Sequence, residues 1–147
     1  MSTNRINRDD LFMELALSFS KRSTCMRGQV GGVLVRRDHV IAHGYNGSPK
    51  RLPHCSEVGC DVQDPADGCQ RAIHCEANII AYAAKVGVST DEAVLYNTHA
   101  PCKKCAELIA SAGIVDVFYI YPYRLRDGLE LLNKLSVVTY RMDEPIS

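Results

Sequence analysis

The chain has 147 residues, 46% of them hydrophobic, and its 17 basic residues are balanced by 17 acidic ones. This length suffices for one domain over residues 1–147 and is too short for two, and the zero net charge argues against a nucleic-acid polymer as substrate. Seven cysteines, without a signal peptide or an apolar stretch of membrane-spanning length, predict reduced thiols, no membrane partner and a cytoplasmic location.

The first half of the chain predicts a helix, a β-hairpin and a long loop. Apolar residues at helical spacing, with two aspartates in the first turn, predict a packing helix over 9–22. The β-branched run 30–35 and the run 40–43 predict the hairpin. Turn-forming residues fill 44–49, where a tight turn is the simplest interpretation. Residues 50–72 show no periodicity, so a loop of this length needs something to order it.

That loop contains three cysteines and a histidine. Disulfides are rare in the cytoplasm, and zinc held by thiolates can close such a segment at little entropic cost. Cys55, Cys60 and Cys69 therefore predict a structural zinc site, for which Cys25 or His54 could supply the fourth ligand. The alternative is that these thiols are incidental.

The second half of the chain alternates helices and strands. We predict a helix that starts beside His74 and strands over 94–97, 115–121 and 137–140. Two further helices are predicted over 102–112 and 127–135. With the first half, this order predicts an α/β fold with helices on both faces of a mixed sheet. Ligands in such folds gather at helix starts beside strand ends.

Two short motifs lie at two of these helix starts. His74-x-Glu76 is followed by Cys102-x-x-Cys105, preceded by Pro101, and this combination is the signature of zinc nucleobase deaminases. One imidazole and two thiolates hold Zn²⁺ and leave a fourth position for a water, which the metal acidifies. A carboxylate that does not bind the metal can then move protons. We predict a catalytic zinc held by the histidine and the two cysteines, with Glu76 as the acid–base group.

Helix geometry restricts how these residues can meet. Residues two apart point in nearly opposite directions inside a helix, so His74 and Glu76 can share a site only at a first turn. Cys102 and Cys105 lie on one helical face, and we expect Pro101 at the first helical position. The positive ends of both helices would favour thiolates.

The chain resembles the deoxycytidylate (dCMP) deaminases of the cytidine deaminase-like superfamily from Arg5 to about Arg124. The superfamily shares the two zinc motifs, and the Gly44-Tyr45-Asn46-Gly47 loop with the cysteine-rich insertion is what points to dCMP. The resemblance implies a three-layer α/β/α fold and zinc-dependent hydrolysis of dCMP to dUMP and ammonia, which supplies thymidylate synthesis. It also implies a homo-oligomer, often a hexamer, activated by dCTP and inhibited by dTTP, with Mg²⁺ accompanying the triphosphate.

The same resemblance implies substrate contacts. Asn46 would contact the sugar, Tyr123 and Arg124 would line or gate the nucleotide site, and Arg5 and Ser23 would lie near the phosphate. The backbone at Cys75 and Ala100 would hold the pyrimidine edge.

The resemblance also bears on Cys75 and on the cysteines of a second zinc site. Cys75 replaces the usual alanine between the motif histidine and glutamate, and we expect its thiol to point away from the metal. In some relatives a second zinc is held by residues that match Cys25 and Cys55, which implies a site completed by Cys60 and Cys69, with His54 in reserve.

Two other functions compete with this interpretation. An RNA adenosine deaminase, such as one acting on tRNA, carries the same core signature but needs an electropositive groove, which the neutral charge disfavours. A non-catalytic, zinc-stabilised nucleotide-binding module would have no need for Glu76. The sequence leaves open whether the base carries a 5-methyl or 5-hydroxymethyl group, which would suit a phage enzyme acting in the host cytoplasm.

Overall fold

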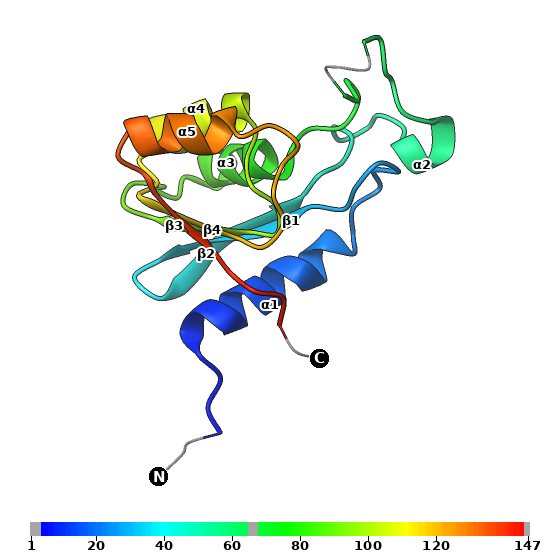
Figure 1. Cartoon of the computed structure of the whole chain (residues 1–147). Coiled ribbons are helices and arrows are strands. Elements are labelled where there is room, and N and C mark those ends of the chain that lie inside the picture. The colour runs from blue at the N-terminus through cyan, green and yellow to red at the C-terminus, as the bar shows by residue number, and fades with distance from the viewer. Residues whose placement is uncertain (1–3, 65–67, 146–147) are drawn as a thin grey trace.

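The computed structural model describes residues 4–64 and 68–145 (Figure 1). The elements, in chain order, are α1 (Arg8–Ser20), β1 (Gly31–Arg36), β2 (His39–Tyr45), α2 (Cys55–Val58), α3 (Cys75–Val86), β3 (Val94–Asn97), α4 (Lys103–Ser111), β4 (Asp116–Tyr119), α5 (Asp127–Lys134) and β5 (Val138–Arg141).

The strands form a single mixed sheet in the order β2-β1-β3-β4-β5. β1 runs antiparallel to β2 and to β3, whereas β3, β4 and β5 are parallel. Figure 1 shows α1 on one face of the sheet and α3, α4 and α5 on the other. The predicted three-layer α/β/α fold with a mixed sheet is therefore confirmed.

The sheet separates two hydrophobic clusters. One lies beneath α3, α4 and α5 and includes Leu34 and Ile79, and the other lies beneath α1 and includes Met13 and Val33. Val33 and Leu34 are neighbours on β1 but belong to opposite clusters, because successive strand residues point to opposite faces. The continuous apolar run of β1 thus contributes side chains to both hydrophobic clusters.

The sequence interpretation was wrong at two helix starts. α4 begins at Lys103, with Cys102 as its N-cap, so Pro101 precedes the cap and is not the first helical residue. The predicted long loop contains the short helix α2, in which the Glu57 carboxylate accepts a hydrogen bond from the backbone N–H of the cap residue His54. Four residues are too few to show helical periodicity, which is why the pattern missed this turn.

The segment that carries α2 reaches beyond the end of the sheet, on the side away from the β1–β2 turn (Figure 1). Among the described helices, none is both long enough and apolar enough to cross a membrane.

Close contact between α1 and β1 depends on Gly31. A Cβ atom there would lie 2.2 Å from the Ala16 carbonyl oxygen and 2.3 Å from the Ser20 nitrogen, both rigid backbone atoms. We expect Gly31→Ala to lower the free energy of unfolding by about 3 kcal/mol, because the helix must move off the sheet. Gly28→Ala is the matched control, since a Cβ at Gly28 meets no atom within 4 Å. Urea denaturation of both variants checks this, and equal stabilities would contradict it.

Candidate active site

The ends of two helices bring the predicted zinc ligands together. His74 is the N-cap of α3 and Cys102 is the N-cap of α4, and both have extended backbone conformations. The His74 Nδ1 atom lies 3.5 Å from the Cys102 Sγ atom and 3.4 Å from the Cys105 Sγ atom. All three donor atoms lie within 4.8 Å of one another.

These separations fit a tetrahedral zinc ion. With Zn–N near 2.0 Å and Zn–S near 2.3 Å, a tetrahedral angle places nitrogen and sulfur ligands about 3.5 Å apart. His74, Cys102 and Cys105 match that spacing and supply three ligands, the number found at catalytic zinc sites with an open position. The donor set therefore fits the metal that the motifs predict.

The pKa values of the two thiols of this site are shifted in opposite directions. A hydrogen bond from the Cys105 thiol, with further help from His74, lowers the pKa of Cys102 to about 4. The same hydrogen bond and burial raise the pKa of Cys105. A lowered pKa favours the thiolate form of Cys102, which is the form that binds a metal.

Glu76 lies beside the three donors, on the first turn of α3. It is buried, and burial raises the pKa of its carboxyl group, while a hydrogen bond with the Cys105 thiol lowers it. Its Oε1 atom accepts a hydrogen bond of 2.6 Å from the side-chain amide of Asn97. A buried carboxyl beside a metal site, with its own fixed donor, has the surroundings expected of an acid–base group.

A cavity of about 320 Å³ opens over this site. His74, Glu76 and Cys102 line it from the metal side. The predicted substrate-binding residues that also line it are Asn46, Cys75, Ala100, Tyr123 and Arg124, and two cysteines of the predicted structural zinc site, Cys25 and Cys69, line it as well. Its volume suits a small ligand.

Three of these lining residues have defined internal contacts. The Asn46 side chain accepts from the Val30 N–H at 2.9 Å and donates to the Gly28 carbonyl at 2.8 Å, which leaves one amide N–H for a ligand. The Cys75 thiol donates to the Gly44 carbonyl at 3.3 Å, so it is directed to β2. The Ala100 N–H donates to the Tyr121 carbonyl.

The two residues predicted near the phosphate do not line this cavity. Among the described residues, neither Arg5 nor Ser23 lines the cavity. The Ser23 hydroxyl is buried and donates to the Asn46 carbonyl at 2.9 Å, so it supports a lining residue from behind.

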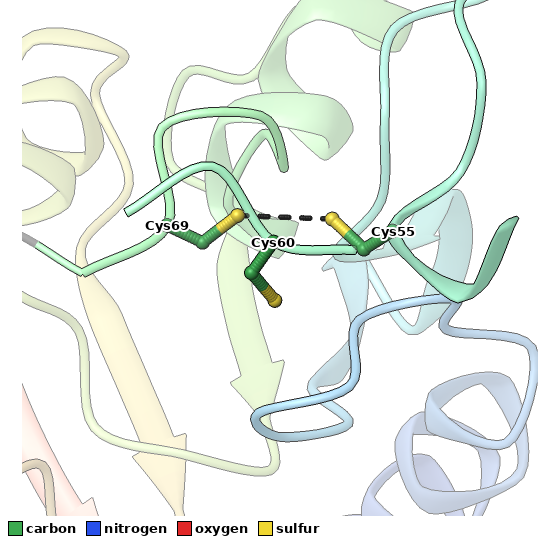
Figure 2. Close-up of side chains that lie close together, drawn as sticks. All are labelled: Cys55, Cys60 and Cys69. Carbon is green, nitrogen blue, oxygen red and sulfur yellow. Dashed lines mark hydrogen bonds between the residues drawn. The ribbon is translucent and has the colours of Figure 1, made fainter. Parts of the chain in front are cut away.

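Figure 2 shows a second group of thiols, Cys55, Cys60 and Cys69. Their sulfur atoms lie within 4.8 Å of one another, and the Cys55 and Cys69 sulfurs are 3.7 Å apart. Two thiolates on a tetrahedral zinc are separated by about 3.8 Å. Burial raises the pKa of Cys55 to about 11. Burial has the same direction of effect on Cys69, but backbone N–H groups outweigh it and lower that pKa to about 7.

The proposed fourth ligands are not part of this group. Cys25 is near enough for its charge to raise the pKa of Cys60, but it lies outside the set of mutually close donors. The Nδ1 atom of His54 lies 3.3 Å from the Thr24 hydroxyl.

Sequence reasoning missed three residues with polar side chains at the site. Arg27 and His99 line the cavity, and Asn97 contacts Glu76. Asn97 and His99 lie in the segment that links β3 to the second zinc motif, so their place in the sequence could have indicated them. No pattern in the sequence indicates Arg27.

Comparisons with known proteins agree with this geometry. The family model for the cytidine and deoxycytidylate deaminase zinc-binding region matches residues 6–121. The chain is 40% identical to ComE operon protein 2 of Bacillus subtilis, over 95% of this chain and 73% of that protein. It is 38% identical to the deoxycytidylate deaminase of Schizosaccharomyces pombe, over 93% of this chain but only 44% of the yeast protein.

A solved structure of a dCMP deaminase is also similar to this chain. The dCMP deaminase of the cyanophage S-TIM5, in complex with dCMP and dUMP, superposes with a TM-score of 0.83 at 33% identity, covering 95% of this chain and 100% of that one. The residues matched by the family model, 6–121, include both zinc motifs. The chain therefore belongs to the cytidine and deoxycytidylate deaminase family.

Proposed function

We propose that the protein hydrolyses dCMP to dUMP and ammonia. The observation that carries this proposal is the buried Glu76 carboxyl beside three zinc donors under a cavity of nucleotide-binding size. The similarity to the cyanophage and yeast dCMP deaminases supports dCMP as the substrate.

The residues of the site have separate chemical tasks. A zinc ion held by His74, Cys102 and Cys105 would acidify a water molecule. Glu76 takes the proton of that attacking water and protonates N3 of the pyrimidine. It then takes the proton of the hydroxyl group now on C4 and delivers it to the amino group, so that the C4 carbonyl forms as ammonia leaves. The carboxyl thus returns to its starting state at the end of each turnover.

The cavity walls suit the rest of a nucleotide. Arg27 and Arg124 supply guanidinium groups for a phosphate, and Arg124 lies over the Tyr123 ring at 5.8 Å from its centroid. Cys75 is the first residue of α3, where backbone N–H groups have no intrahelical acceptor. Its N–H and the carbonyl of Ala100 are suited to the pyrimidine edge.

The direct test is incubation with dCMP while the ultraviolet absorbance is followed. We expect conversion to dUMP, weaker or no turnover of cytidine and dCTP, and only a slight dependence on salt. A panel that includes 5-methyl-dCMP defines tolerance at C5. Absence of dCMP turnover by zinc-loaded protein would refute the proposal, and steep salt-dependent binding of RNA would favour a polynucleotide substrate.

We extend the proposal to a structural zinc held by Cys55, Cys60 and Cys69, with Cys25 as the fourth ligand. The proximity of the three sulfurs supports it. Wild-type protein should then contain two zinc ions per chain and Cys55→Ser one, with a lower melting temperature, because the ion orders a long segment. Elemental analysis checks this, with His54→Ala as a control that keeps both ions. A single zinc in fully loaded wild type would remove the structural site.

Assembly and regulation complete the proposal. The resemblance supports one deaminase domain acting in the cytoplasm as a hexamer, activated by dCTP with Mg²⁺ and inhibited by dTTP. Sedimentation velocity and initial rates with each triphosphate test these properties independently of the chemical step.

A further inference from the structure

Asn97, the last residue of β3, is fully buried against the site, with an exposed fraction of 0%. Its Nδ2 atom donates to the Glu76 Oε1 atom at 2.6 Å and to the His99 carbonyl oxygen at 2.8 Å. A single amide group therefore contacts both the acid–base residue and the segment that leads into the second zinc motif.

The orientation of this amide follows from its partners. The His99 carbonyl oxygen can only accept, so the amide nitrogen must face it. The same nitrogen faces Glu76, and its two N–H groups are used on these two acceptors. Asn97 thus donates a hydrogen bond to Glu76. This bond holds the Glu76 carboxylate oxygen in place, and Asn97 itself takes no proton from Glu76.

The surroundings of Asn97 offer little else to explain a polar residue there. Its Oδ1 atom has no hydrogen-bond partner among the described residues. The residue opposite on β1 is Gly32, where a Cβ would lie 2.5 Å from that oxygen. The Asn97 side chain therefore fits here only because Gly32 has no side chain. An unsatisfied buried carbonyl is unfavourable for stability, and its retention points to a role outside folding.

We infer that Asn97 is a positioning residue that fixes the Glu76 carboxylate for proton transfer. With one oxygen held by Asn97, the other remains to exchange protons with the attacking water and the pyrimidine. The bond to the His99 carbonyl aligns Glu76 with the neighbouring backbone of Ala100. This inference rests on the proposed deamination, because it assigns a task within that reaction.

The test compares Asn97→Leu, which has nearly the same size but no donor, with Asn97→Asp, which replaces the donor by a second carboxyl. Asn133→Leu, the same change at an exposed position of α5, is the control. For Asn97→Leu we expect kcat for dCMP to fall 10- to 100-fold, the range for a displaced catalytic group, with KM within threefold and zinc content unchanged. Asn97→Asp should be slower still, because its carboxyl repels Glu76.

Several outcomes would overturn the inference. These are an unchanged kcat in Asn97→Leu, a change confined to KM, or a loss of zinc or of melting temperature that accounts for the slower rate. If the variants do not fold, nitrogen-15 spectra of the wild type and Glu76→Gln decide. The Asn97 side-chain N–H resonances should move between these two proteins, and an unmoved pair would refute the contact. Failure of the wild type itself to turn over dCMP would instead refute the proposed function.

Discussion

Glu76→Gln should abolish most of the deaminase activity while leaving the fold and the zinc content intact. Glutamine keeps the size of the side chain and can still accept from Asn97 through its carbonyl oxygen. It cannot accept the proton of water or deliver one to N3 and to the leaving amino group. Acid–base catalysis contributes 10²- to 10⁴-fold, and because Glu76 serves every transfer we expect kcat to fall by about 10⁴-fold or more.

The matched control is Glu107→Gln on the exposed surface of α4, which should retain wild-type rates. Ultraviolet assays give kcat, and elemental analysis gives zinc per chain. Turnover by zinc-loaded Glu76→Gln within tenfold of the wild type would show that another group moves the protons.

The same substitution has a predicted effect on stability. Burial raises the pKa of Glu76 above its ordinary value of 4.5. A carboxyl whose pKa is higher in the folded chain than in the unfolded chain destabilises the fold increasingly as pH rises above the unfolded value. With zinc removed by a chelator, Glu76→Gln should therefore melt above the wild type at neutral pH, and the difference should disappear in acid.

The layers of the fold were predictable because their patterns are local. The helix predicted over 9–22 is α1 at Arg8–Ser20, and the run 30–35 is β1 at Gly31–Arg36. The short helix Cys55–Val58 was missed, because side-chain capping and not periodicity marks it. A periodic apolar face identifies an element of three turns, but not one of a single turn.

At the site, the sequence predicted the metal ligands and the acid–base residue better than it predicted the other residues that line the cavity. His74, Cys102 and Cys105 come together because each lies on or near a helix start, which the motif spacing required. Arg27 reaches the same cavity from the segment after α1, far away in the sequence. Only the three-dimensional path of that segment places it there, and no spacing rule encodes such a path.

Cys105→Ser should remove the catalytic zinc and the activity together. Cys105 is buried, and its sulfur lies 3.4 Å from the His74 Nδ1 atom. A serine hydroxyl is a shorter and harder ligand that stays protonated at neutral pH, so only two of the three donors would remain effective. We expect zinc affinity to fall by more than 100-fold, since changes to groups that merely support ligands already cost 10- to 100-fold.

The control for this variant is Cys75→Ser, which also removes the thiol of a buried cysteine that lines the cavity. The Cys75 sulfur is directed to the Gly44 carbonyl, and a serine hydroxyl can donate to the same oxygen. Elemental analysis should therefore find one zinc fewer per chain in Cys105→Ser than in the wild type, and no loss in Cys75→Ser.

Zinc also stabilises the folded state by about 4 kcal/mol when present at a thousand times its Kd. Adding zinc to metal-free protein should thus raise the melting temperature of Cys75→Ser more than that of Cys105→Ser. Equal zinc content in the two variants would mean that Cys105 is not a ligand, and with it the argument for an acidified water beside Glu76 would fail.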